Sequence, residues 1–381
     1  MTLFPLAERK WEDFLENKIK NYSAKRNYDY GPLEESSVSK ISPYVSHRIL
    51  LEYQIIKDTI SKYKGNNVNK FIEEVYWRIY WKGTLENKPC IWENFITQEI
   101  ELNDLENYRR AIAGETNIPY FNDWIDELKT HNYLHNHTRM WFASTWIFTL
   151  GLPWQLGVRF FFEHLYDGDA ASNLLSWRWV AGLQTKGKRY IFSTQNLKKF
   201  SNNRHTVKNI INQDIVLEDN FNMVYSNQIY QSDMRKSSDW LIMFENDLHV
   251  DSLTNIINRY KYVLIVFLED KDRIIKLSSA VKNFKLNLLK EFSNKFSNIK
   301  TISSIELINE LREIRSVDLI YPSIGDNYEF IKLFQKKYKI KVKNLVRPED
   351  LYSWQFAKKG FFKFKENIGT INNFLFKPES V

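Results

Sequence analysis

The chain has 381 residues and a formal net charge of +8. A single cysteine, Cys90, excludes an internal disulfide, a cysteine-based zinc site and an iron–sulfur cluster, so we predict no metal and a cytoplasmic protein. The basic excess favours an anionic partner such as nucleic acid, although a lysine-rich, low-GC genome would produce the same charge.

Residues 1–205 show apolar positions at helical spacing, which predicts an all-α domain. The stretch Met140–Val158 carries no charge and is long enough for a membrane span. Gly151 and Pro153 interrupt it, so we predict two buried helices joined at Gly151 and no membrane association. The clearest helical patterns are Trp11–Tyr22, Phe71–Trp81, Ile125–Tyr133, Thr138–Leu150 and Trp154–Tyr166.

The polar, Asn-rich residues 206–238 are interpreted as a linker, after which the pattern changes. Short apolar runs alternate with helical patterns at Ile274–Phe296 and Tyr328–Tyr338. This alternation predicts an α/β domain over residues 239–381 with a parallel, Rossmann-like sheet of five strands. The runs that read as strands are Trp240–Phe244, Tyr262–Phe267, Val317–Tyr321 and Ile340–Leu345.

The segment DGDAASNLLSWRW, residues 167–179, combines acids, an amide and two tryptophans. In a helix that starts after Asp169, Asn173 and Trp177 continue one stripe, while Trp179 lies about 200° around the axis from Trp177. The two tryptophans are therefore expected to face different partners. The simpler interpretation is a capping aspartate followed by a helix that is buried on two sides.

Two further helical segments bring polar and aromatic side chains onto one face. Glu74, Trp77 and Arg78 follow the i, i+3, i+4 spacing, which also fits an ordinary Glu–Arg pair beside a core tryptophan. Asn136 and Met140 share a face, and Arg139 beside them is expected to pair with Asp167 or Asp169, or to lie on an ordinary surface helix.

Near the start of the chain, Ser39, Lys40 and Ser42 surround an expected helix start with Pro43 in its first turn. Hydroxyl groups, a lysine and free backbone N–H groups at this place suit a phosphate. A plain serine cap is the more common use of the same pattern.

Taken in order, these motifs resemble the flavin-binding domain of the photolyase/cryptochrome family over about residues 8–200. The resemblance rests on YSAKR (22–26), SKISPY (39–44), EEVYWR (73–78), IPYFNDW (118–124), LHNHTRM (134–140), the W-x-x-G at 154–157 and DGDAASNLLSWRW. The second half is similar to the α/β antenna domain of the same family, which normally comes first. The order here therefore implies a circular permutation.

The resemblance implies an FAD in a bent conformation and light-driven repair of cyclobutane pyrimidine dimers in UV-damaged DNA, by a monomeric lyase. The alternative is a cryptochrome-type photoreceptor without repair activity. The residues implied for FAD are Tyr22, Ser39, Lys40, Ile41, Ser42, Arg139, Asp167, Asp169 and Asn173. Those implied for catalysis and electron relay are Glu74, Asn136, Trp154 and Trp177, and those for DNA are Trp77, Arg78, Met140, Trp179, Lys186, Lys188 and Arg189.

The chain departs from the family pattern at several positions. The distal relay tryptophan falls near Glu101, so Trp92 or Tyr108 is the expected substitute. His137 stands where the family usually has arginine, Val38 where it has threonine and Asn122 where it has aspartate. Glu245 replaces an arginine of the antenna domain, so no tightly held second chromophore is expected.

Overall fold

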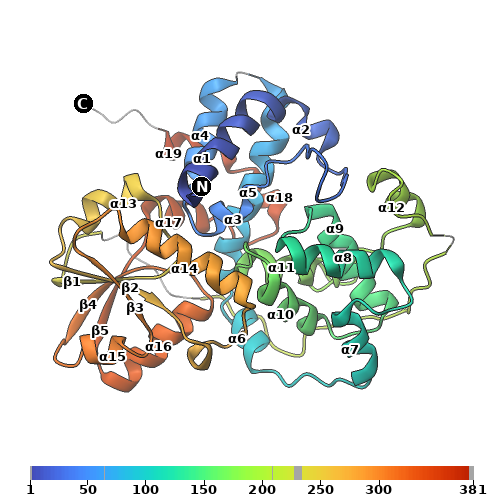
Figure 1. Ribbon diagram of the computed structural model, residues 1–381. Helices are drawn as coiled ribbons and strands as arrows, with labels where there is room; N and C mark the ends of the chain where they lie inside the picture. The colour runs from blue at the N-terminus through green and yellow to red at the C-terminus, as the bar shows by residue number, and fades with distance from the viewer. Residues whose placement is uncertain (1, 64, 208, 227–233, 377–381) are drawn as a thin grey trace.

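The computed structural model describes residues 2–63, 65–207, 209–226 and 234–376. A helix-rich part and an α/β part with a five-stranded parallel sheet lie side by side (Figure 1), which confirms the predicted fold class. The elements of the helical part are α1 (Leu3–Asp13), η1 (Phe14–Lys18), α2 (Ile19–Lys25), α3 (Ser42–Ser46), α4 (Glu52–Lys62), η2 (Asn66–Val68), α5 (Asn69–Asn87), α6 (Cys90–Thr97), α7 (Leu105–Ala113), α8 (Pro119–His131), α9 (Asn136–Ser144), η3 (Thr145–Thr149), α10 (Trp154–His164), α11 (Ala170–Val180) and α12 (Thr194–Phe200).

The uncharged stretch Met140–Val158 forms the end of α9, the π-helix η3 and the start of α10. Gly151 separates them with φ of +67°, a left-handed conformation that few residues other than glycine adopt readily. The predicted pair of helices joined at Gly151 is thus confirmed. Among the described residues, no helix has both the length and the apolar character that a membrane crossing requires.

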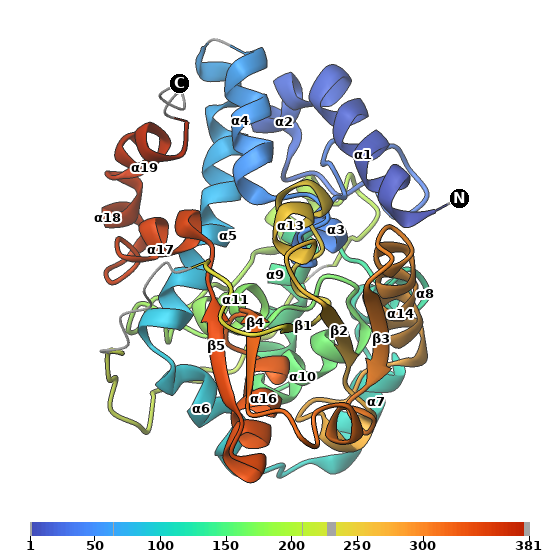
Figure 2. The same ribbon diagram turned by 90° about the vertical axis from the view of Figure 1, so that its left-hand side faces the viewer.

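The α/β part is built on strands in the order β3-β2-β1-β4-β5, all parallel. Ile242 lies opposite Leu264 on one neighbouring strand and Leu319 on the other. Figure 2 shows the strands in this order. Their bounds are β1 (Trp240–Met243), β2 (Tyr262–Phe267), β3 (Ile299–Ser303), β4 (Ser316–Ile320) and β5 (Lys341–Leu345), and the helices between them are α13 (Val250–Ile257), η4 (Asp270–Asp272), α14 (Ser279–Ser293), α15 (Leu307–Glu310) and α16 (Asp326–Tyr338).

Alternating side chains of the sheet enter two different cores. Leu241 and Met243 pack in one core with α13, α14 and the N-terminal helices, whereas Ile242 and Phe244 pack in the other with α15 and α16. This alternation follows from the two-residue period of a strand. The face of the sheet that carries Leu241 therefore shares its core with the helical part.

The chain after β5 returns to the helical part. α17 (Pro348–Trp354), α18 (Phe361–Lys365) and α19 (Ile368–Leu375) lie beside α5 at the β5 side of the sheet (Figure 2). Their side chains Ala357, Phe361 and Phe364 belong to the main core of the helical part. The division at residues 205 and 238 into two domains and a linker remains a prediction. Residues 209–226 contain no helix or strand and run along the helical part, with Gln213 N donating to Phe148 O at 2.6 Å.

Candidate functional site

The helix α11 places the two tryptophans of its sequence in different surroundings. Trp177 is 2% exposed and packs edge-on against Phe161, with a ring-centroid distance of 5.1 Å. It lies so close to α10 that a Cβ on Gly157 would come within 2.2 Å of the indole. Trp179 is half-buried and stacks on Tyr190 at 5.3 Å. The expectation of two different partners is confirmed.

Asp169 caps α11 by accepting a hydrogen bond from Ser172 N at 2.9 Å. The capping role expected of an aspartate here is therefore present, and the same side chain has a second use. Its Oδ2 lies 2.7 Å from Arg78 Nη1 on α5. Arg78 also contacts Glu52 through Nε at 3.2 Å, so a single guanidinium joins α4, α5 and α11.

The sequence left open whether Arg139 pairs with Asp167 or Asp169. In the structure it pairs with Asp167. Asp167 Oδ2 accepts a hydrogen bond from Arg139 Nη2 at 2.9 Å, and the nearby Ser42 contributes to the lowered pKa of this carboxylate. Burial opposes ionisation, but Arg139 and Ser42 outweigh it and lower the pKa of Asp167. Tertiary folding thus brings the serine of the expected phosphate segment to the acid of the distant α11 segment.

We name Arg78, Arg139, Asp167 and Asp169 the site cluster. Asp167 Oδ1 and Arg78 Nη2 are buried atoms of this cluster without a hydrogen-bond partner. The indole nitrogen of Trp177, which lies on the same stripe of α11 as Asp169, is also buried without a hydrogen-bond partner. Buried polar atoms are rarely left unpaired, so an acceptor and two donors here indicate a site for a polar ligand. A flavin ring edge, which carries both donors and acceptors, fits this set.

Three more of the residues expected to hold FAD lie at the start of α3 or next to it. Ile41 is the residue before this helix and no side chain caps it, so the serine cap considered as the alternative is absent. Lys40 has a positive φ of 51° and lines a cavity of about 800 Å³ beside Tyr44 and Tyr133. Ser39 is half-buried in the same segment.

Tyr22 and Asn173 lie deeper in the helical part. The Tyr22 ring packs edge-on against Phe71 at 5.3 Å, and burial together with the negative charge of Glu74 raises its pKa. Asn173 is buried, and its Nδ2 donates to Val158 O at 3.1 Å. The remaining capacity of its side-chain oxygen is what an added ligand would use.

The side chains expected to contact DNA are less concentrated. Glu74 pairs with Lys70 at 2.8 Å and lies 3.7 Å from Arg26, so the ordinary Glu74–Arg78 pair considered as the alternative is not formed. Trp77 stacks on Phe361, at 3.6 Å between ring centroids. On α9, Asn136 is exposed and Met140 half-buried.

The basic residues after Trp179 are partly neutralised. Lys186 is exposed and lies 3.1 Å from Glu218, and Lys188 is also exposed. Arg189 pairs with Asp214 at 2.9 Å and covers the Phe148 ring. Two of the three expected phosphate contacts therefore already have a carboxylate beside them.

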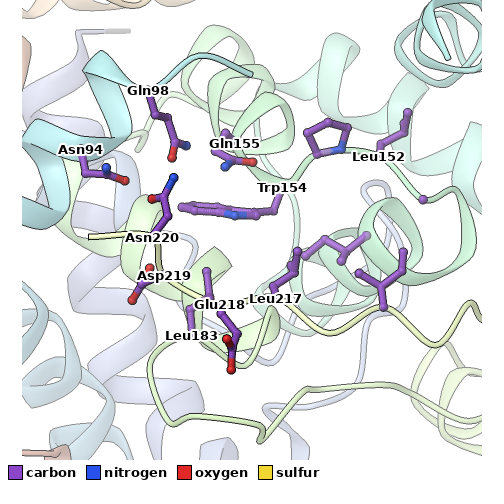
Figure 3. A pocket seen from close by; sticks show the side chains of 14 residues that line it. Asn94, Gln98, Leu152, Trp154, Gln155, Leu183, Leu217, Glu218, Asp219 and Asn220 are labelled. Atoms are coloured by element: carbon purple, nitrogen blue, oxygen red, sulfur yellow. The ribbon is translucent and has the colours of Figure 1, made fainter. Parts of the chain in front are cut away.

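Trp154 lies at a polar pocket of about 300 Å³, where Figure 3 shows its indole among the side chains of Gln98, Gln155 and Asn220. The guanidinium of Arg178 lies 5.9 Å from the ring centroid. Both terminal nitrogens of Arg178 donate to Asp219, at 2.7 and 2.6 Å, so a carboxylate balances this charge beside the ring. The ring of Phe95 lies between Trp92 and Trp154. Its centroid is 5.7 Å from that of Trp92 and 6.3 Å from that of Trp154.

Trp146 was not identified from the sequence, where it appeared only as part of an apolar run. Its side chain is fully buried. The centroid of its ring lies 6.3 Å from that of Trp177 and 6.0 Å from that of Tyr108, and Tyr108 is half-buried. Among the described residues, no ring contact joins Trp154 to Trp177. Trp146 therefore connects the rings of Trp177 and Tyr108. A tryptophan at an otherwise aliphatic helical position was the available signal.

A second group of buried charges lies where the α/β part meets the helical part. We name Arg48, Asp247, Arg347 and Asp350 the joint cluster. Arg48 binds both oxygens of Asp350 at 2.7 Å, and Arg347 binds both oxygens of Asp247 at 2.5 and 2.8 Å. Asp247 follows β1, and Arg347 follows β5.

In an open parallel sheet, ligands usually bind at the carboxyl ends of the strands where the strand order reverses, and here that point lies beside β1. Arg48 of the helical part occupies this position, and the remaining cavity is only about 10 Å³. The nearby Glu245 accepts a hydrogen bond from Lys285 at 2.8 Å. Although burial opposes ionisation, Lys285 and Arg273 lower the pKa of Glu245 to about 2. Among the described residues, no group of three or more His, Cys, Asp or Glu side chains is arranged to hold a metal ion.

Part of the helical region is similar in sequence to known proteins. Residues 71–222 match the family model described as the FAD binding domain of DNA photolyase. The deoxyribodipyrimidine photo-lyase of Buchnera aphidicola is 28% identical over 224 residues, which cover 55% of this chain and 46% of the relative. That of Salmonella typhimurium is 30% identical over 149 residues, covering 38% and 30%.

Two solved structures match this chain with lower sequence identity and TM-scores below 0.5. A bacterial class III photolyase from Agrobacterium tumefaciens is 24% identical with a TM-score of 0.43, and covers 52% of this chain and 42% of its own. A cryptochrome from Synechocystis is 20% identical with a TM-score of 0.46, and covers 52% and 43%. The matched part spans about a third to a half of the length of the curated relatives. The family model and the curated sequence relatives support a relationship to DNA photolyases.

Proposed function

We propose that this protein uses FAD and light to repair cyclobutane pyrimidine dimers in DNA. The observation that carries the proposal is the site cluster, in which residues far apart in sequence meet and leave polar atoms unpaired. The matched family model supports FAD as the ligand. The carboxyl-terminal α/β part would be the antenna-like domain, placed last by circular permutation.

The residues of the site cluster would hold the flavin ring, with Asn173 and the Trp177 indole beside it. Tyr22, Ser39, Lys40, Ile41 and Ser42 would hold the phosphates and the sugar chain. When bound, FAD would supply the absorption of light and the electron that opens the dimer. The protein supplies a dry site, because Asp167 and Trp177 are almost fully buried.

The substrate would be a dimer turned out of the DNA stack, as is general for enzymes that act on bases inside a duplex. Trp77 and Trp179 would stack on it, and Met140 would contact its apolar parts. Glu74 would accept hydrogen bonds from its N–H groups, and Asn136 would bind beside it. Lys186, Lys188 and Arg189 would contact phosphates of the flanking strand.

Resupply of electrons would use a path that differs from the one expected through Trp154. Trp177 would lose an electron, Trp146 would replace it, and Tyr108 would replace that of Trp146 and release its phenolic proton to water. The ring contacts at 6.3 and 6.0 Å support this order. An external thiol would then reduce the tyrosyl radical.

The alternative is a cryptochrome-type photoreceptor without repair activity. The carboxylates that already neutralise Lys186 and Arg189 favour it, because they weaken an electrostatic surface for DNA. The joint cluster and Glu245 support the absence of a tightly held antenna chromophore in either case.

One experiment tests the proposal. The purified protein is reconstituted with FAD, reduced chemically, and illuminated with blue light in the presence of single-stranded and duplex DNA that contains thymine dimers. Loss of dimers that requires both light and Glu74 supports repair. Bound FAD with light-induced spectral changes but unchanged dimers supports the photoreceptor, and failure to bind FAD rejects both.

A further inference from the structure

The side chain of Trp77 is covered on one face by a residue from the other end of the chain. Phe361 of α18 lies parallel to the indole, with ring centroids 3.6 Å apart and an interplanar angle of 11°. Stacked nucleobases have a similar spacing. Phe361 is 4% exposed, whereas Trp77 keeps part of its surface accessible.

The segment that carries Phe361 is fixed to α5 along its length. Lys365 pairs with Glu73 at 3.0 Å, one helical turn before Trp77. Towards the other end of α5, a Cβ on Gly83 would come within 2.8 Å of Ala357 Cβ, so the two backbones lie unusually close. These contacts make Phe361 part of a packed core and not part of a loosely held lid.

We infer that Phe361 is a positioning residue, which holds Trp77 flat so that its remaining face can stack on a flipped base of the DNA substrate. This inference rests on the proposed function, which assigns Trp77 to the substrate. A tryptophan on a helix surface loses rotamer freedom when it stacks, and this loss opposes binding. A ring already held by Phe361 has lost that freedom before the DNA arrives, which is the advantage of a preorganised contact.

In the opposite role, Phe361 would occupy the place of the base on Trp77 and so compete with the DNA. The burial of Phe361 and the anchoring of α18 at both ends favour positioning. The two roles predict opposite changes in DNA affinity when Phe361 is replaced, so one set of variants separates them.

The test uses the full-length protein with Phe361→Leu, which keeps an apolar side chain but removes the flat ring, and Phe361→Tyr, which keeps the ring. Phe362→Ala is the matched control, because Phe362 is the next residue on α18 and is 80% exposed. Two quantities are measured: the dissociation constant for a dimer-containing oligonucleotide, and the 19F spectrum of protein labelled with 5-fluorotryptophan. The Trp77 resonance is assigned with Trp77→Phe.

Phe361→Leu should shift and broaden the Trp77 resonance and weaken binding by about two- to tenfold, the range expected for one aromatic pair. Phe361→Tyr should restore both, and Phe362→Ala should change neither. Tighter binding by Phe361→Leu, or an unchanged Trp77 resonance, would overturn the inference. If the wild-type protein binds no dimer-containing DNA, the proposed function fails, whereas the 19F spectra still decide whether Phe361 holds Trp77.

Discussion

The site cluster and the joint cluster lie on either side of Glu52, a fully buried carboxylate that contacts Arg78 at 3.2 Å and Arg48 at 3.3 Å. Each cluster contains two arginines and two aspartates, yet their hydrogen bonding differs. In the joint cluster both aspartates have both oxygens bonded, and Tyr53 adds a further bond to Asp350 at 2.9 Å. In the site cluster a carboxylate oxygen, Asp167 Oδ1, has no hydrogen-bond partner, nor has Arg78 Nη2, whereas the unpaired atom of the joint cluster is Arg48 Nε, 3.3 Å from Glu52.

The difference shows that buried charged side chains do not by themselves identify a functional site. In the joint cluster the arginines bond both oxygens of each aspartate, and such a network holds two parts of a protein together. In the site cluster a carboxylate oxygen stays unpaired, and a ligand would supply its missing hydrogen bond. The two clusters have the same composition, and the joint cluster is the more buried, with side chains 4–8% exposed against 3–22% in the site cluster. The predictions below test the distinction, beginning with the largest expected effect.

Arg48→Met should destabilise the protein more than any other change proposed here. It leaves the buried carboxylate of Asp350 without its cationic partner, whereas Glu52 keeps Lys82 and Arg78, and breaking a buried pair in this way costs about 3–5 kcal/mol. Urea unfolding of the apoprotein measures the effect. Lys282→Met is the control, because its pair with Asp270 is exposed and is worth about 0–1 kcal/mol. Equal costs for the two variants would refute the structural role of the joint cluster.

Asp167→Asn should act mainly on the ligand. A hydrogen bond to a charged group contributes about 1.5–3 kcal/mol, so the affinity for FAD should fall roughly ten- to a hundredfold. Flavin fluorescence during titration gives the affinity, and unfolding gives the stability. Asp247→Asn should show the reverse, with lost stability and unchanged FAD affinity. Equal losses of FAD affinity in both variants, with neither protein unfolding, would contradict the assignment of different roles to the two clusters.

Trp146→Phe should slow the photoreduction of bound flavin at least tenfold and leave FAD content unchanged, because it interrupts the contact between Trp177 and Tyr108. Trp154→Phe is the matched control, since in the described part of the chain no ring contact joins Trp154 to Trp177. Transient absorption after a blue flash measures the rate. A larger effect from Trp154→Phe would restore the path that the sequence suggested.

The stability of the apoprotein should fall as the pH decreases from 6.5 towards 4, because His47 is buried without charge. Burial, and then Lys285, lower its pKa from 6.5 to about 4. A group with a lowered pKa contributes stability above its unfolded value, and this is lost as the pH falls towards the folded value. At pH 5.5 the loss is about 1 kcal/mol. His47→Gln should remove this component, so identical pH profiles for both proteins would contradict the prediction.

The smallest effect is expected at the basic residues after Trp179. Lys188→Ala should lower the slope of log affinity for DNA against log salt by about 0.9, which corresponds to one phosphate contact. Lys186→Ala should change it less, because Glu218 lies 3.1 Å from that ammonium. Affinity measured between low and moderate salt decides the point, and a flat dependence in the wild type would exclude this surface.

Most of the sheet could be predicted from short apolar runs, and β1, β2, β4 and β5 begin within one residue of those runs. The edge strand β3 was not recognised, because only Ile302 of its five residues is buried and its pattern is therefore too polar. Spacing likewise predicted the opposite directions of Trp177 and Trp179. The same spacing suggested a Glu74–Arg78 pair that is not formed, and it did not reveal that Phe361 covers Trp77.

The sequence alone determined the properties that depend on neighbours along one helix or strand: the cap at Asp169, the break at Gly151 and the alternation of the strands. Only the tertiary structure decided that Ser42 reaches Asp167, that Trp146 lies against Trp177 and that Phe361 covers Trp77. The last pair is separated by more than two hundred residues. Helical and strand periods specify which face of an element is apolar, but contacts between distant elements depend on how all those faces pack together. For that reason the candidate cofactor residues were identifiable from motifs, whereas the arrangement that prepares them for a ligand was not.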